Sequence, residues 1–100
     1  MNLGSAITLC RNIRKLKQYE VAKRAGISVA YLSLLERSER KDPALSTVQS
    51  LAEALQVPTG ILFFLAAEDT ELSGLSPELR EKLSYAALQM LNEPTQPSLL

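Results

Sequence analysis

The stretch Gly26–Arg40 reads GISVAYLSLLERSER and predicts a tight turn followed by a short helix. Gly26 is free to adopt a positive φ, so it can end a preceding helix, which we expect near 18–25. The Ser28 hydroxyl can accept a hydrogen bond from the free amides of the next helix, which we expect over 28–37. Two short helices joined by such a turn form a helix-turn-helix, although similar pairs also occur in plain helical bundles.

On both sides of this helix pair, apolar residues recur at helical spacing, and no stretch alternates as a strand would. Ser46 followed by Gln49 predicts a capping box at the start of a fourth helix. The fold class is therefore expected to be all-α, with further helices near 4–16, 46–56, 58–66 and 77–92. The expected organisation is a helical domain over 1–67, a linker over 68–76, a C-terminal helix over 77–92 and a flexible tail over 93–100.

The amino-acid composition argues against several classes of function. The chain has 100 residues, no histidine and one cysteine, Cys10. That content argues against disulfide frameworks, zinc sites and histidine-based catalysis, so we expect no enzyme activity, metal or cofactor. The N-terminus has no signal-peptide pattern, and the longest apolar run, Ile61–Ala67, is too short to span a bilayer. We therefore expect a cytoplasmic protein.

Charge is sorted along the chain although the net charge is zero. Residues 1–41 hold nine basic and three acidic side chains, whereas residues 42–100 hold two basic and eight acidic ones. Such asymmetry favours one surface that meets a polyanion and another that is kept away from it. The alternative is a solvated charged surface that sorts by sequence without a partner.

Three segments carry a resemblance to a known family: IRKLKQYEVAKRAGIS, YLSLLERSER and TVQSLAEALQVPTGILFF. Together they make residues 7–66 similar to the lambda-repressor/Cro-like family of helix-turn-helix regulators, the XRE family. The resemblance implies a five-helix DNA-binding domain, with the helix at 77–92 as an addition. It also implies a sequence-specific transcriptional regulator of double-stranded DNA, most simply a repressor. The alternative is an antitoxin or adaptor whose main partner is a protein, such as a toxin or another regulator.

The resemblance also implies roles for individual residues. Gln18 and Ser28 match positions that bind phosphate, and three cations match positions where the helix exit and the next loop approach the DNA backbone. Arg11 and Glu36 match an internal salt bridge. Positions that read bases are matched by Val29, Ala30, Ser33 and Leu34, and the backbone-contacting cations by Arg37, Arg40 and Lys41.

This chain departs from the family pattern at several of these positions. Lys17 stands where a Ser or Thr cap is common, and Ser38 and Gln56 each replace a frequent glycine after a helix. The base-reading positions are mostly apolar, with Ser33 as the polar exception. Apolar side chains cannot pair with base edges but can contact thymine methyl groups. The sequence therefore predicts a thymine-containing site, with much of the affinity supplied by phosphate contacts.

The C-terminal helix has an apolar stripe that must cover something. It can fold back on its own domain, or it can form a two-fold interface with a second chain, which we favour because dimers match operator half-sites. The expected dimer interface consists of Phe63, Phe64, Leu79, Leu83, Ala87 and Met90.

Overall fold

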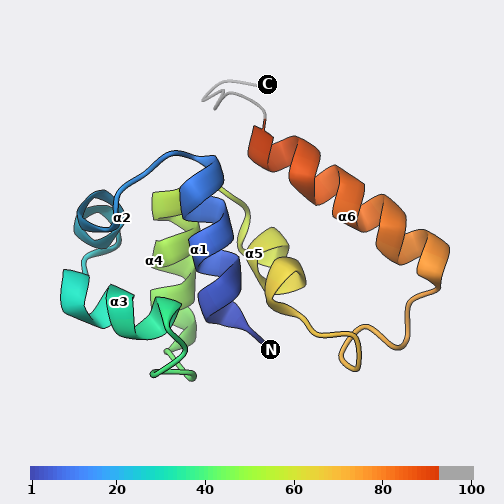
Figure 1. Ribbon diagram of the computed structural model, residues 1–100, viewed down its shortest axis with the longest axis horizontal. Helices are drawn as coiled ribbons and strands as arrows, with labels where there is room; N and C mark the ends of the chain where they lie inside the picture. The colour runs from blue at the N-terminus through green and yellow to red at the C-terminus, as the bar shows by residue number, and fades with distance from the viewer. Residues whose placement is uncertain (93–100) are drawn as a thin grey trace.

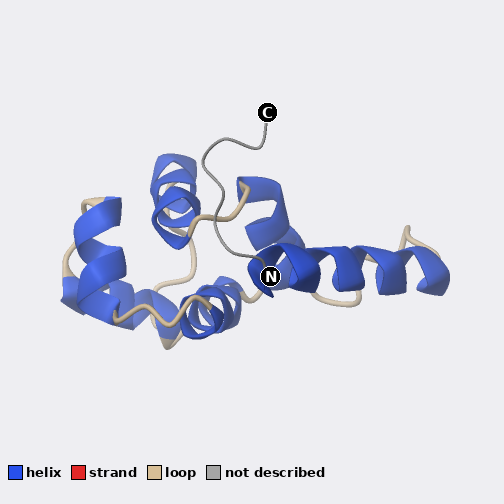
Figure 2. Ribbon diagram, turned by 90° about the horizontal axis from the view of Figure 1, so that it is seen from above, coloured by secondary structure: helices blue, strands red, loops and turns tan. Residues whose placement is uncertain are grey.

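A computed structural model describes residues 1–92 of the chain, and these residues form helices and loops without a strand, as expected for an all-α fold (Figure 2). The tail predicted over 93–100 lies outside the described residues. The helices are α1 (Leu3–Ile13), α2 (Gln18–Ala25), α3 (Val29–Glu36), α4 (Leu45–Leu55), α5 (Thr59–Ala66) and α6 (Pro77–Asn92).

The first five helices enclose one apolar core. Helix α2 packs on α4, α1 packs on α5, and α3 lies against both α1 and α2 (Figure 1). The largest side chains that are fully buried come from all five helices and from α6: Ile7, Val21, Leu32, Leu35, Leu51, Leu55, Leu62 and Leu91. Among the described residues, no single helix is long and apolar enough to cross a membrane.

The turn at Gly26 folds as predicted. Gly26 adopts φ 73° and ends α2, and its N–H donates to the carbonyl of Lys23. The Ser28 hydroxyl accepts from the Tyr31 N–H at 3.0 Å and caps α3. Helix α3 is one residue shorter at each end than predicted, because Ser28 and Arg37 serve as its caps. The Gly26 turn therefore sets the angle between α2 and α3 and places α3 at the surface.

The end of α1 and the start of α4 also differ from the prediction. Helix α1 ends at Ile13 rather than at Leu16, because Lys15 adopts φ 58° and reverses the chain. Leu16 lies beyond the helix but still packs on the core, so the apolar pattern correctly indicated that it faces inward. The predicted capping box is wrong: α4 begins at Leu45, with Ala44 as its N-cap and no side-chain cap.

Ser38 and Gln56 adopt the left-handed conformation that glycine prefers, with φ of 61° and 60°. Gln56 is the C-cap of α4, and Ser38 follows Arg37, the C-cap of α3. A side chain at positive φ costs free energy because its Cβ crowds the neighbouring carbonyl. The fold therefore keeps the turn geometry at these two positions without the residue that suits it best.

Helix α6 touches the rest of the protein along a narrow strip. It contacts α1 and α5, with its C-terminal end toward α1 and its N-terminal end extending away (Figure 1). Ala87 and Leu91, one turn apart, are the buried residues of α6. The Arg14 guanidinium adds hydrogen bonds from α1 to the carbonyls of Gln56 and Met90, at 2.8 and 3.4 Å.

Candidate nucleic-acid interface

Helix α3 presents one face to solvent and one to the core. Leu32 and Leu35 are buried, as the helical periodicity predicts. On the other side, Val29 is 44% exposed and Ala30 is exposed, while Ser33 and Leu34 are half-buried. All four predicted base-reading residues therefore remain accessible, and only Ser33 among them can form side-chain hydrogen bonds.

Three cations follow this face at the exit of α3. Arg37, Arg40 and Lys41 are all exposed. The Arg37 Nε atom lies 2.7 Å from Glu39 Oε2, in an ion pair whose side chains are more than half exposed. Long basic side chains at an exposed helix exit can reach the phosphates that border a groove.

Helix α3 is fixed at its other side by a nearly buried carboxylate, that of Glu36, whose side chain is 6% exposed. Arg11 donates to both of its oxygens, from Nε at 2.8 Å and from Nη2 at 2.9 Å. The Thr8 hydroxyl also donates to Glu36, at 3.2 Å. The structure therefore brings Arg11 and Glu36 together as an internal pair between α1 and α3.

Gln18 begins α2 beside the same carboxylate. Its Nε2 donates to Glu36 Oε1 at 3.2 Å, so the side chain is held against α3 and is half-buried. Helix α2 starts without a side-chain cap, and Glu20 Oε1 instead accepts from the Lys17 N–H at 2.9 Å. The start of α2 is thus anchored near α3, within the basic half of the chain, residues 1–41.

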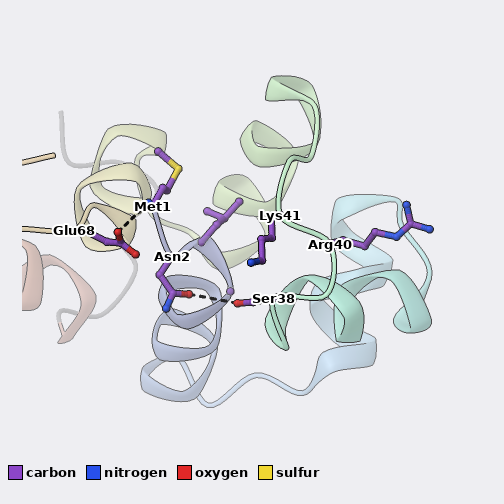
Figure 3. Close-up of a pocket in the computed structure, with 8 residues that line it drawn as sticks. Met1, Asn2, Ser38, Arg40, Lys41 and Glu68 are labelled. Atoms are coloured by element: carbon purple, nitrogen blue, oxygen red, sulfur yellow. Dashed lines mark hydrogen bonds and ion pairs between the residues drawn. The ribbon is translucent and has the colours of Figure 1, made fainter. Parts of the chain in front are cut away.

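A small pocket lies between the start of α1 and the loop after α3 (Figure 3). It has a volume of about 170 Å³, and Asn2 and Ser38 approach each other across it at 3.5 Å. Lys41 extends toward this pocket, whereas the guanidinium of Arg40 points away from it (Figure 3). The Met1 ammonium is hydrogen-bonded to Glu71, which raises its pKa.

The predicted dimer residues divide into two groups. Phe63 and Phe64 on α5 are half-buried, and Ala87 is fully buried against its own domain. The α6 residues Leu79, Leu83 and Met90 are 43%, 38% and 40% exposed. Helix α6 therefore both packs on its own domain and leaves an apolar stripe uncovered.

Three residues near the interface were missed from the sequence. Thr8 belongs to the Glu36 hydrogen-bond network, and Glu39 pairs with Arg37. Gly4 lies where α1 approaches α3 so closely that a Cβ would be 2.8 Å from the Glu36 carbonyl oxygen. The helical spacing of Thr8 from Arg11 could have indicated the first. The close contact of Gly4 depends on tertiary packing, and that of Glu39 depends on the left-handed turn at Ser38. The sequence displays neither.

An exposed α3, a preceding α2 joined to it by a glycine turn and basic residues at the helix exit define a helix-turn-helix module. Comparison with known proteins agrees: the family model described as Helix-turn-helix matches residues 7–62. The chain belongs to this helix-turn-helix family.

Similar curated proteins come from Bacillus and one of its phages. The immunity repressor protein of Bacillus phage phi105 is 40% identical over 57 residues, which are 57% of this chain and 39% of that protein. The HTH-type transcriptional repressor RghR of Bacillus subtilis (strain 168) is 34% identical over 65 residues, 65% of this chain and 48% of RghR. An uncharacterized HTH-type transcriptional regulator of the same strain, YozG, is 38% identical over 58 residues, 57% of this chain and 69% of YozG.

The chain thus spans less than half the length of the phage repressor and of RghR. The matched part is the helix-turn-helix domain, and α6 lies beyond the family match. Family and relatives together support a DNA-binding transcriptional regulator.

Proposed function

We propose that this protein is a dimeric, sequence-specific repressor that reads the major groove of double-stranded DNA with α3. The carrying observation is the accessible outer face of α3, which is followed directly by three exposed cations. An α-helix fits the major groove of B-DNA, and the preceding helix of such a module lies across the backbone. The names of the phage repressor and RghR favour repression as the regulatory outcome.

Base reading in this proposal depends mainly on apolar contact. Val29, Ala30 and Leu34 would contact thymine methyl groups, and the Ser33 hydroxyl would donate to or accept from a base edge. A bidentate hydrogen-bonding pair supplies about 1–3 kcal/mol of discrimination, which such side chains cannot provide. We therefore expect the preferred site to contain thymine at the contacted positions and to be selected partly by DNA shape.

Phosphate contacts would supply most of the affinity. Arg37, Arg40 and Lys41 would contact one stretch of backbone at the exit of α3, and Gln18 and Ser28 another at the starts of α2 and α3. Neutralised phosphates release counterions, so affinity falls steeply as salt rises. The anchored position of Gln18 beside Glu36 supports this role, because the second N–H of its amide is left to donate to a phosphate.

In vitro site selection followed by fluorescence anisotropy at several salt concentrations tests the DNA-binding proposal. We expect one palindrome-like site to be enriched and the logarithm of its affinity to fall linearly with that of salt. Tight binding to a protein partner combined with a flat salt response would contradict the proposal and support an adaptor instead.

Two variants separate phosphate contacts from base reading. Arg40→Glu should weaken all DNA sequences alike, because phosphates carry no sequence information. Leu34→Ala should mainly change which site is preferred. Lys82→Glu, the same kind of charge reversal on exposed α6, is the matched control and should bind DNA as the unmodified protein does. If Arg40→Glu and Leu34→Ala leave binding unchanged, the assignment of α3 is wrong.

The proposed dimer uses the uncovered stripe of α6 together with α5. Leu79, Leu83 and Met90 share one helical face, beside the Ala87 face that packs on the protein's own domain. A second copy is the preferred occupant because homodimers are the commonest assemblies. Two copies would double the small set of base contacts.

Light scattering tests the dimer directly. We expect twice the 11.0 kDa mass of one chain at micromolar concentration. Leu83→Glu should produce a folded monomer with weaker affinity for the palindromic site. Gln89→Glu adds the same charge on the polar side of α6 and should leave the dimer intact. An 11.0 kDa species for the unmodified protein at high micromolar concentration would overturn the dimer.

A further inference from the structure

The acidic residues of the basic half have different surroundings. Residues 1–41 contain three of them, Glu20, Glu36 and Glu39, and the structure describes all three. Glu20 accepts from the Lys17 N–H at 2.9 Å, and Glu36 is held by Arg11 at 2.8 Å. The Glu20 carboxylate therefore stabilises the start of α2, and the Glu36 carboxylate holds α3 against α1. Glu39 lies in the loop after α3, and its partner is a predicted DNA-contacting residue.

Backbone geometry sets Glu39 beside Arg37. The left-handed conformation of Ser38 reverses the chain at the end of α3, and the Glu39 N–H donates to the Leu34 carbonyl at 2.9 Å. This turn brings Glu39 Oε2 to 2.7 Å from Arg37 Nε. The side chains are 61% exposed for Arg37 and 56% for Glu39, so water and incoming anions can reach the pair.

We propose that Glu39 is a built-in counter-charge that competes with a DNA phosphate for Arg37 and thereby limits the affinity of the interface. This inference rests on the proposed DNA contact of α3. A phosphate that approaches Arg37 must displace the carboxylate or bind near a like charge. Exposed ion pairs are weak, so the exchange is feasible and its effect on affinity is modest, about two- to five-fold.

The other two cations of this surface provide the contrast. Within the described residues, no ion pair involves Arg40 or Lys41. Glu39 therefore acts on one of the three proposed phosphate contacts. Releasing one cation for a phosphate contact should steepen the dependence of log affinity on log salt by about 0.9.

A double-mutant cycle tests the inference, with affinity for the selected DNA site measured at several salt concentrations. Glu39→Gln should raise affinity about two- to five-fold at low salt and steepen the salt dependence by about one ion. In an Arg37→Gln background the same change should have little effect, because the competed cation is gone. Glu81→Gln, on exposed α6, is the matched control and should leave affinity unchanged.

Two results would overturn the inference while leaving DNA binding in place. Weaker binding by Glu39→Gln would mean that the carboxylate orders Arg37 for contact. An equal gain with and without Arg37 would mean that Glu39 acts on the whole surface and not through this cation. Absence of DNA binding by the unmodified protein would instead overturn the proposed function, and this inference with it. Circular dichroism verifies that each variant is folded.

Discussion

Arg11 and Glu36 join α1 to α3 through two hydrogen bonds, from Nε at 2.8 Å and from Nη2 at 2.9 Å. The remaining Arg11 nitrogen, Nη1, donates to the Leu16 carbonyl at 3.1 Å, so one guanidinium also holds the loop after α1. The Glu36 carboxylate is nearly buried and accepts from Thr8 and Gln18 as well. The angle at which α3 faces outward therefore depends on this pair.

Arg11→Met should lower the free energy of unfolding by about 3 kcal/mol. Removing one partner of a buried ion pair typically costs about 3–5 kcal/mol, because the other charge is left in the interior. We take the lower end because the Arg11 side chain is 17% exposed. Urea denaturation followed by circular dichroism measures the change. Lys23→Met, on the exposed side of α2, should have a much smaller effect. A loss below 1 kcal/mol for Arg11→Met would contradict a structural role.

Much of the fold was predictable because its signals are local. Helical periodicity, the Gly26 turn and the Ser28 cap each depend on a few neighbouring residues, and all three are present in the structure. The errors arose where tertiary packing overrides local preference. Helix α1 ends at Ile13 because the chain turns at Lys15, and α4 begins at Leu45 without using Ser46 as a cap.

The candidate site was predictable in part. The sequence identified the residues of α3, and the structure leaves their outer face accessible. It did not indicate that Gln18 is tied to Glu36 or that Arg37 is paired with Glu39, because these contacts join side chains whose separation depends on packing and turn geometry. Their roles on DNA stay predictions that binding measurements must test.

Gln56→Gly should raise the free energy of unfolding by about 0.5–1 kcal/mol. Gln56 has φ 60°, where a side chain is crowded and glycine is not. The gain is limited because glycine loses more conformational entropy on folding. The Gln56 carbonyl that accepts from Arg14 at 2.8 Å belongs to the main chain and is kept. Thermal denaturation measures the effect.

The converse variant is Gly26→Ala, at φ 73° with open space around the added Cβ. It should lower the free energy of unfolding by about 1 kcal/mol, through backbone strain alone. A destabilised Gln56→Gly would show that the side-chain interactions of Gln56 outweigh the relief of strain at its backbone.

Gly4→Ala should destabilise the protein more than Gly26→Ala does. A Cβ at Gly4 would be 2.8 Å from the Glu36 carbonyl oxygen and 2.9 Å from Ser38 Oγ. The main-chain carbonyl can move only if α3 shifts, so we expect a loss of about 1–3 kcal/mol from overpacking. Gly60→Ala is the matched control, because nothing lies within 4 Å of its Cβ and alanine favours the helix of α5.

Both Gly4 and Gly60 variants are compared by urea denaturation. We expect opposite signs, with Gly60→Ala stabilised by about 0.5–1 kcal/mol. Equal stabilisation by the two alanines would show that α1 and α3 are farther apart in solution than the structure places them. Of the two variants, only Gly4→Ala should lower the affinity for DNA, because a shift of α3 would misplace the proposed contact face.

Cys10 should be unreactive in the folded protein and should report its unfolding. The side chain is fully buried, and burial raises the pKa of its thiol from 9.0 to about 11, partly offset by the charge of Arg14. The thiolate is the reactive form, so alkylation at neutral pH requires the chain to open. We expect iodoacetamide to label Cys10 slowly in buffer and rapidly in denaturing urea. Rapid labelling in buffer, with circular dichroism unchanged, would contradict the burial of the Cys10 side chain.

The same shift predicts a loss of stability at high pH. Because the folded thiol holds its proton more tightly than the unfolded one, this group contributes its full stabilisation below pH 9, and the contribution is lost as pH rises toward 11. Other groups titrate in this range, so the measurement is the difference in pH dependence between the unmodified protein and Cys10→Ala. The alanine variant starts less stable because it leaves a small cavity. Its unfolding free energy should nevertheless fall less steeply between pH 9 and 11, and identical slopes would show that Cys10 does not titrate differently in the two states.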